Sequence, residues 1–276
     1  MLGAKMTDTL GDYMKQLEGE EAGRRAVVGK PLIARLDGRA FHTFTKGLTR
    51  PFDERLTLLM QETTQFLVEQ TNALIGYTQS DEITLIWYLP EVSRRRGTDE
   101  PAPQASQYLF DGRYQKMCSI LSAMATGYFN KNLPGLIPEK LLSLPLFDAR
   151  VWQVPKLSDA RLALLWREND AIKNSISMVA QSHFSSSALE GVSGEKKKQM
   201  LREIGDPWEA YPSYCRRGSY FKRVSETVPL DAETLAKIPE QFRDANKMIT
   251  RRPVKMIELP LIGEVSEEIL FAQGGS

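Results

Sequence analysis

Two short acidic motifs, Asp37-Gly38 and Asp81-Glu82, have residue types that could do chemistry together. Carboxylate oxygens are ligands that Mg²⁺ prefers, and pairs of Mg²⁺ ions activate the attacking oxygen and stabilise the leaving oxygen in phosphoryl transfer. A glycine lets its backbone oxygen approach an ion closely. The motifs therefore suit a metal site for nucleotidyl transfer. Asp-Gly and Ser-Asp-Glu are also common in turns, and residue types alone leave both interpretations open.

The apolar spacing predicts which elements position these motifs. In order, the predicted elements are a strand over 31–37, a helix over 52–72, a hairpin over 73–89, a helix over 113–130 and a strand over 144–154. This β-α-β-β-α-β order is that of a ferredoxin-like split βαβ unit, in which the first strand lies beside the hairpin. Since Asp37 ends the first strand and Asp81 lies in the hairpin turn, we expect both at one edge of the sheet.

The rest of the chain is predicted to be mainly helical after residue 155. The further predicted elements are a helix over 7–21, a mobile loop over 90–107, helices over 159–181 and 195–204, and a strand over 253–260. We therefore expect two regions: a catalytic region over 1–155, which includes the first helix and the loop, and an α-rich region over 156–276 that packs on it. Trp166 is expected in the core.

Composition limits the class of protein more than its activity. The chain has 36 Lys and Arg against 35 Asp and Glu, so contact with nucleic acid would need a local basic patch. Two cysteines and two histidines are too few for a usual zinc site, and the cysteines are expected to be reduced thiols. The N-terminus lacks an apolar signal segment, and no stretch approaches about 18 uninterrupted apolar residues. We expect a cytoplasmic protein.

Several motifs, in order and at their separations, resemble one known family. They read RLDGRAFHTF (35–44), RPFD (50–53), YTQSDEITL (77–85), FDARVWQVP (147–155) and LLWRENDAIKNS (164–175). These motifs resemble those of the tRNA(His) guanylyltransferase (Thg1) superfamily. The resemblance implies an α+β fold, with a polymerase-like palm on the ferredoxin-like βαββαβ sheet and an additional α-rich region. It also implies two Mg²⁺ ions held by Asp37, the Gly38 carbonyl and Asp81, with Asp37, Asp81 and Glu82 as the catalytic carboxylates.

The same resemblance implies a set of nucleotide-binding residues. They are Arg35, Arg39, Arg50, Asp53, Arg113, Lys116 and Asn174. Arg113 and Lys116 lie one helical turn apart at a predicted helix start, which suits a triphosphate, although a solvated helix start explains them equally well. In the family's HINNLYN segment this chain reads IKNSISM (172–178), so that only Asn174 is kept. That departure is typical of the bacterial and archaeal Thg1-like proteins.

The function implied is templated 3′–5′ addition of nucleotides to the 5′ end of tRNA, as in 5′-end repair. The 5′ end would be activated with ATP and then attacked by the 3′-hydroxyl of an incoming NTP such as GTP. The expected partners are the tRNA acceptor stem, nucleoside triphosphates and further copies of the chain in a homotetramer. Two alternatives remain: a palm-type nucleotidyl cyclase, and a noncatalytic RNA-binding module on a ferredoxin-like sheet. The second alternative needs stacking aromatics in the central strands, which 31–37 lacks.

Overall fold

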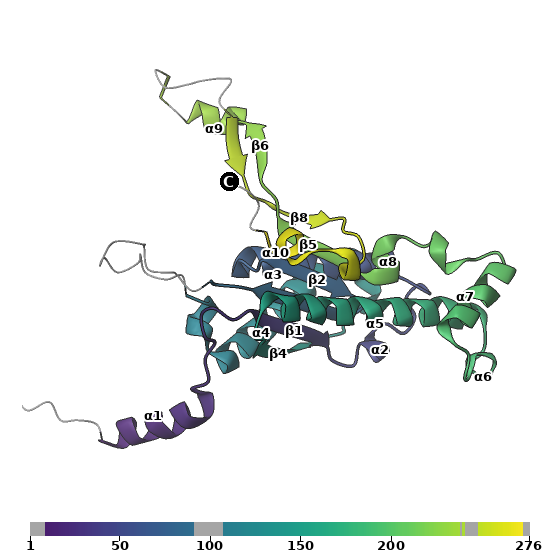
Figure 1. Ribbon diagram of the computed structural model, residues 1–276, viewed down its shortest axis with the longest axis horizontal. Coiled ribbons are helices and arrows are strands. Elements are labelled where there is room, and N and C mark those ends of the chain that lie inside the picture. Colours follow the sequence, from purple (N-terminus) through teal and green to yellow (C-terminus); the bar gives the residue numbers. More distant parts are fainter. Residues whose placement is uncertain (1–8, 91–106, 238, 241–247, 273–276) are drawn as a thin grey trace, which may run out of the picture.

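The computed structural model describes residues 9–90, 107–237, 239–240 and 248–272. Its centre is a six-stranded sheet of order β4-β1-β3-β2-β5-β8, in which every neighbouring pair is antiparallel (Figure 1). The strands are β1 (Leu32–Gly38), β2 (Ile75–Gln79), β3 (Glu82–Trp87), β4 (Phe147–Gln153), β5 (Ser219–Arg223) and β8 (Val254–Ile257). A separate two-stranded sheet pairs β6 (Glu226–Pro229) with β7 (Met248–Arg251).

The predicted βαββαβ order is confirmed. Strands β1 to β4 are joined by helices α3 (Glu54–Thr71) and α4 (Tyr114–Leu136), and their order in the sheet, β4-β1-β3-β2, is that of a split βαβ unit. Asp53 caps the N-terminus of α3 by accepting a hydrogen bond from the Arg55 backbone N–H. Helix α3 carries the chain to β2, which lies one strand away from β1 in the sheet. The next strand, β3, lies between the two and pairs directly with β1.

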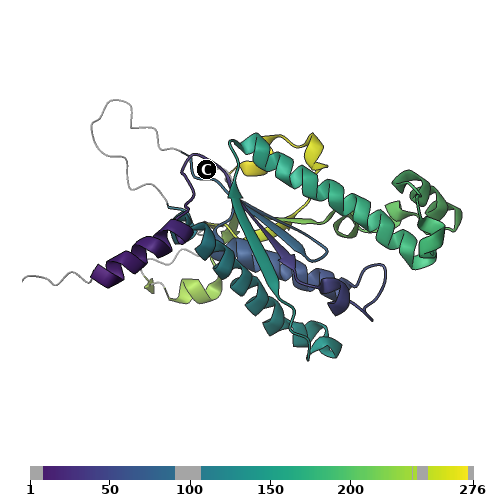
Figure 2. The ribbon, with the colours of Figure 1, turned by 90° about the horizontal axis from the view of Figure 1, so that it is seen from below.

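The two faces of the sheet bury different halves of the alternating pattern. Leu32, Ala34 and Leu36 are fully buried with residues of α3 and α4, whereas Ile33 packs with α5 (Leu157–His183) on the other face. Both faces of β1 are therefore covered, as its nearly continuous apolar sequence requires. Figures 1 and 2 show α5 crossing the sheet and running on beyond it.

The C-terminal half adds strands to the same sheet. The predicted strand over 253–260 is confirmed as β8, but β5 was not predicted. The remaining helices are α1 (Thr9–Ala22), α2 (Phe41–Phe44), α6 (Ser186–Leu189), α7 (Gly194–Glu203), α8 (Ser213–Arg217), α9 (Ala232–Ala236) and α10 (Glu267–Phe271). Short 3₁₀ turns occur at Leu109–Gly112, Pro138–Lys140, Trp208–Ala210 and Ile262–Glu264.

The periphery bears on two further predictions. Helix α1 confirms the predicted N-terminal helix and buries none of its residues against the rest of the described chain. The predicted mobile loop over 90–107 falls almost wholly outside the described residues. Within the part of the chain that the structure describes, no helix has the length and apolar character needed to cross a membrane.

Candidate active site

Asp37 and Asp81 meet at one edge of the sheet, as their spacing predicted. Asp37 lies near the end of β1 and Asp81 in the turn between β2 and β3, and the Gly38 backbone N–H donates a hydrogen bond of 3.0 Å to the Asp81 backbone oxygen. Burial raises the pKa of the Asp81 carboxyl, and the negative charge of Asp37 raises it further. The two carboxylates are thus close enough to repel each other.

Asp37 lies in a row of three carboxylates across three strands. Its register partners are Glu82 on β3 and Asp148 on β4, and directly opposed residues of an antiparallel pair project from the same face. An arginine neutralises each of these two partners: Arg167 Nε lies 2.5 Å from Glu82 Oε1, and Arg150 Nη2 lies 3.5 Å from Asp148 Oδ1. Asp37 forms no ion pair or hydrogen bond through its carboxylate with any residue in the described part of the chain.

A divalent cation suits this uncompensated pair of charges. The oxygen ligands at Asp37 and Asp81 match the preference of Mg²⁺, which usually takes one or two carboxylates and completes its shell with water and substrate phosphates. Within the described ranges, no three Asp, Glu, His or Cys side chains converge on a point that could hold a metal by themselves. The remaining ligands would therefore come from outside the side chains, and the Gly38 carbonyl is the neighbouring backbone candidate.

Packing as well as chemistry requires glycine at position 38. A Cβ atom there would lie 2.4 Å from the ring of Phe41, which is buried beneath the end of β1. Any side chain at position 38 would displace that ring and, with it, the turn that carries the site.

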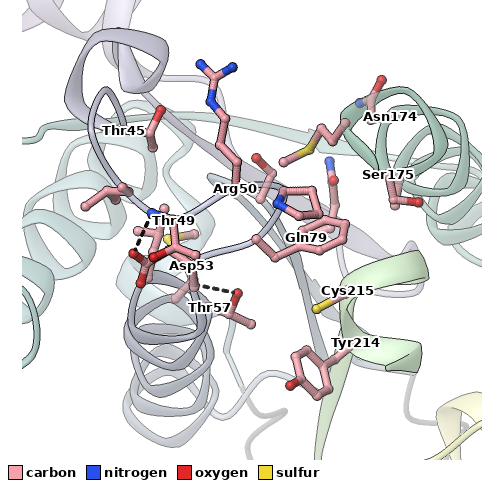
Figure 3. A pocket seen from close by; sticks show the side chains of 18 of the residues that line it. Thr45, Thr49, Arg50, Asp53, Thr57, Gln79, Asn174, Ser175, Tyr214 and Cys215 are labelled. Atoms are coloured by element: carbon pink, nitrogen blue, oxygen red, sulfur yellow. Dashed lines mark hydrogen bonds between the residues drawn. The ribbon is translucent and has the colours of Figure 1, made fainter. Parts of the chain in front are cut away.

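A pocket of about 410 Å³ opens beside the hairpin turn that carries Asp81. Its walls are the segment 42–53, the first two turns of α3, Gln79 and Ser80 at the hairpin turn, the C-terminal half of α5, and α8. Figure 3 shows Thr45, Thr49 and Arg50 facing Asn174 and Ser175 of α5 across this space, with Tyr214 and Cys215 along a third side. Polar groups from four separate segments therefore converge beside the turn that carries Asp81.

The predicted nucleotide-binding residues divide into three groups by position. Arg50 and Asn174 line the pocket, and Arg35 and Arg39 lie on β1 and directly after it, next to Asp37. Arg113 and Lys116 are not brought to this site. They lie at the start of α4, near Gln153 at the end of β4, and Gln153 is the register partner of Leu32 on β1. Leu32 is five strand residues, about 17 Å, from Asp37.

Asp53 also lines the pocket, but its carboxylate is engaged by hydrogen bonds within the chain. Its side chain is 3% exposed and accepts hydrogen bonds from the Thr49 backbone N–H and from the backbone and guanidinium of Arg55. The hydrogen bonds from the Arg55 side chain lower the pKa of Asp53 to about 2. Asp53 therefore shapes the wall of the pocket and leaves no free oxygen aimed into it.

Glu82, which was predicted to be catalytic, lies in a buried ion pair. It is 7% exposed, and its two oxygens face Arg167 and, at 3.8 Å, Arg35 Nε. Burial raises the pKa of the Glu82 carboxyl, and the positive charge of Arg167 opposes that rise. In this arrangement Glu82 positions the two arginines beside Asp37, while the acidic pair remains open to ligands.

The sequence interpretation missed Arg167 of α5 and misplaced its neighbour Trp166. Arg167 is 7% exposed, and its position three residues after the buried Leu164 was the signal that a charge lies on the core face of this helix. The expectation that Trp166 lies in the core is wrong, because this residue is 51% exposed. The apolar face of α5 passes through Leu164 and Ala171, and Trp166 is turned away from it.

Comparison with known proteins gives a consistent result. A family model described as tRNAHis guanylyltransferase matches residues 11–155, more than half of the chain. The tRNA(His) guanylyltransferase of Schizosaccharomyces pombe is 26% identical over 236 residues, which are 80% of this chain and 82% of that protein.

Solved structures extend the similarity to nearly the whole chain. A bacterial tRNA(His) guanylyltransferase (Thg1)-like protein in complex with ATP has a TM-score of 0.74 and 28% identity, and the match covers 95% of this chain and 97% of that one. A bacterial Thg1-like protein in complex with GTP has a TM-score of 0.70 and 27% identity, with 96% and 100% covered. The structural match therefore extends beyond residues 11–155 to nearly the whole fold.

Proposed function

The chain belongs to the tRNAHis guanylyltransferase family, and from this premise we propose that it is a nucleotidyltransferase that adds nucleotides in the 3′–5′ direction to the 5′ end of tRNA. The observation that carries the proposal is the pair of uncompensated carboxylates, Asp37 and Asp81, beside a pocket large enough for a nucleotide. The ATP and GTP of the bacterial Thg1-like complexes support nucleoside triphosphates as substrates.

In the proposed reaction the 5′ end is activated by ATP when it bears a monophosphate, which links AMP to that phosphate and releases pyrophosphate. The 3′-hydroxyl of the incoming NTP then attacks the same phosphorus, a new phosphodiester bond forms, and AMP leaves. Asp37 and Asp81, with the Gly38 carbonyl, would hold Mg²⁺. Bound there, the metal would lower the pKa of the attacking hydroxyl and balance charge on the leaving phosphate.

The pocket residues orient the incoming nucleotide. Arg50 and Lys46 bring positive charge to the pocket wall, where they would bind phosphate oxygens, and Arg39 extends that charge toward the end of β1. Arg113 and Lys116 would serve only a ligand long enough to reach the other end of the sheet.

Base choice is proposed to come from pairing with the opposite tRNA strand. Of the segment that departs from HINNLYN, Asn174 and Met178 line the pocket, and Ile172 packs with the apolar cluster beside it. Ile172 and Met178 have no hydrogen-bond donor, and the methionine sulfur is only a weak acceptor, so these side chains are poorly suited to select guanine. We therefore propose templated 5′-end repair rather than dedicated guanylate addition to tRNA(His).

The test is extension of a 5′-truncated tRNA in the presence of ATP, labelled GTP and Mg²⁺. Wild type is expected to give a 5′-extended product, and Asp37→Ala and Asp81→Ala are expected to lose at least about 100-fold in rate, because both remove a ligand that stabilises transition-state charge. Asp148→Ala is the matched control, since its carboxylate lies on the same face but has its own arginine. If wild type forms no 5′-extended product, or if it forms cyclic nucleotide without RNA, the proposal is contradicted.

Three wider expectations accompany this function. We propose that residues 156–276 contact the tRNA, since α5 crosses the sheet and runs on to α6 and α7 (Figure 1). We also propose a homotetramer, from the family resemblance, and a cytoplasmic location, from the two cysteines expected to be reduced thiols. Light scattering of the purified protein tests the first of these two, and imaging of the tagged chain in its own cell tests the second.

A further inference from the structure

The exposed indole of Trp166 lies close to the acidic pair. The guanidinium of Arg35 lies 5.2 Å from the centroid of its ring and that of Arg167 lies 4.5 Å away. Both arginines also face the same carboxylate, Glu82, on β3 of the sheet. Despite these two contacts, Trp166 remains 51% exposed.

Such an arrangement fixes the ring while leaving it accessible. Cation–π contacts from two guanidinium groups hold the indole in one orientation, and Arg167 is itself anchored by Glu82 and, at 3.0 Å, by Asp170. Nucleobases stack on aromatic rings that are held in place and exposed in this way in proteins that bind single strands.

Positive charge surrounds this ring on the sheet as well. Arg150 of β4 is the register partner of Arg35, so both project from the face that carries Trp166. Arg35 Nε is buried and makes no hydrogen bond within the described part of the chain, and it faces Glu82 Oε2 at 3.8 Å. Arg35 precedes Asp37 by two residues, or about 7 Å of strand. Guanidinium groups bind phosphate oxygens well, so a sugar–phosphate backbone could run from Arg150 toward the acidic pair.

The position of Trp166 distinguishes it from the pocket for the incoming nucleotide. Pocket residue Asn174 follows Trp166 by eight residues on α5, a distance of about 12 Å, and the Arg167–Glu82 pair lies between them. The pocket is walled on several sides and accommodates a single nucleotide, whereas Trp166 lies on open surface, which a polymer can reach. We propose that Trp166 is the platform on which the 5′-terminal base of the RNA stacks while its phosphate is held at Asp37 and Asp81.

This inference rests on the proposed function, and kinetics with a 5′-truncated tRNA test it first. Trp166→Ala is expected to raise the KM for the tRNA about 10-fold, the value of one lost base–aromatic stack, while the KM for GTP stays within twofold. Trp166→Phe keeps a ring and is expected to recover most of the loss. Leu162→Ala, one turn earlier and 50% exposed on the same helix, is the control for a general effect on α5.

Binding without turnover provides a second measurement. Trp87 and Trp208 are buried and Trp152 is partly buried, so Trp166 dominates the solvent-sensitive tryptophan fluorescence. The 5′-truncated tRNA, added without nucleotides, is expected to quench that fluorescence in wild type, and the quenching is expected to be lost in Trp166→Phe.

The outcomes separate this inference from the function on which it rests. If Trp166→Ala lowers kcat but leaves the KM for tRNA unchanged, the ring only holds Arg35 and Arg167 in place, and stacking is refuted. Normal extension by wild type without tRNA-dependent quenching also refutes it. If wild type quenches with tRNA but extends nothing, the proposed function fails while the stacking platform stands.

Discussion

At the scale of single residues, charge compensation distinguishes the two carboxylates that we propose to be reactive from their neighbours. Glu82 and Asp148 each have an arginine, and Asp37 and Asp81 have each other. Like charges held close together destabilise the fold, so a site of this kind persists because a cation offsets the repulsion when it binds. The same repulsion makes the metal site testable without measuring catalysis.

Asp81→Asn is expected to be more stable than wild type in EDTA at pH 7, by on the order of 1 kcal/mol, because it removes a buried like charge. The raised pKa sets the sign: ionised Asp81 costs stability above that pKa, and the advantage of the variant disappears as the pH falls through it. Mg²⁺ is expected to stabilise wild type and not the variant. Denaturant titrations with and without Mg²⁺ measure both effects, and equal stabilisation of the two proteins by Mg²⁺ would argue against the site.

At the scale of elements, the start of α3 connects the stability of the fold to the shape of the pocket. Asp53 caps this helix and also accepts a hydrogen bond from the Thr49 backbone, so one carboxylate holds both the helix end and the segment that carries Arg50. We therefore expect Asp53 to affect nucleotide binding indirectly, by ordering the backbone of the segment that carries Arg50.

Asp53→Ala is expected to lower the free energy of unfolding at pH 7 by about 2 kcal/mol, through loss of the cap and of the buried hydrogen bonds. It is also expected to raise the KM for GTP, because the pocket wall loosens. Since the pKa of Asp53 is lowered from 3.8 to about 2, its contribution is present above about pH 4 and is lost as the pH falls toward 2, where wild type and variant should converge.

A second helix cap provides the control for that experiment. Asp231 caps α9, accepts hydrogen bonds from Thr234 and has a pKa lowered to about 2, but it lies outside the pocket. Asp231→Ala should leave the KM for GTP unchanged. An equal rise in both variants would show that loss of a cap, rather than the pocket wall, determines nucleotide binding.

At the scale of the whole molecule, a single buried carboxylate joins the two halves of the chain. Glu168 of α5 is 1% exposed and accepts hydrogen bonds from Arg217, from the Tyr220 hydroxyl and from the Ile262 backbone N–H. Together with the pairing of β2 with β5, these contacts attach the C-terminal segments to the palm sheet. We propose that the boundary near residue 155 divides functions, while the chain folds as one unit.

Glu168→Ala is expected to destabilise the protein by about 3 to 5 kcal/mol, because Arg217 and two other donors lose their buried acceptor. Glu168→Gln keeps one acceptor and is expected to lose less. One cooperative transition, shifted to lower denaturant concentration, is the expected result. Two separate transitions in either variant would show that the halves unfold independently.

Much of this architecture could be predicted from the sequence. Alternation and helical spacing were sufficient for β1, α3, the β2–β3 hairpin, α4 and β4, because each pattern is local and long enough to read. Their order then placed Asp37 beside Asp81, since a split βαβ unit allows few ways to arrange its strands. The motifs around the two residues indicated the family, which the comparisons confirm.

The contacts between segments that are distant in sequence were decided only by the tertiary structure. The Arg167–Glu82 pair, the exposure of Trp166, the joining of β5 to β2 and the position of Arg113 far from Asp37 all depend on which surfaces pack together. Residue types and spacing describe one segment at a time, whereas burial and charge compensation are properties of pairs brought together by folding. The positions of Asp37 and Asp81 at one edge of the sheet were therefore predictable from the sequence. That no cationic side chain in the described part of the chain neutralises them was not.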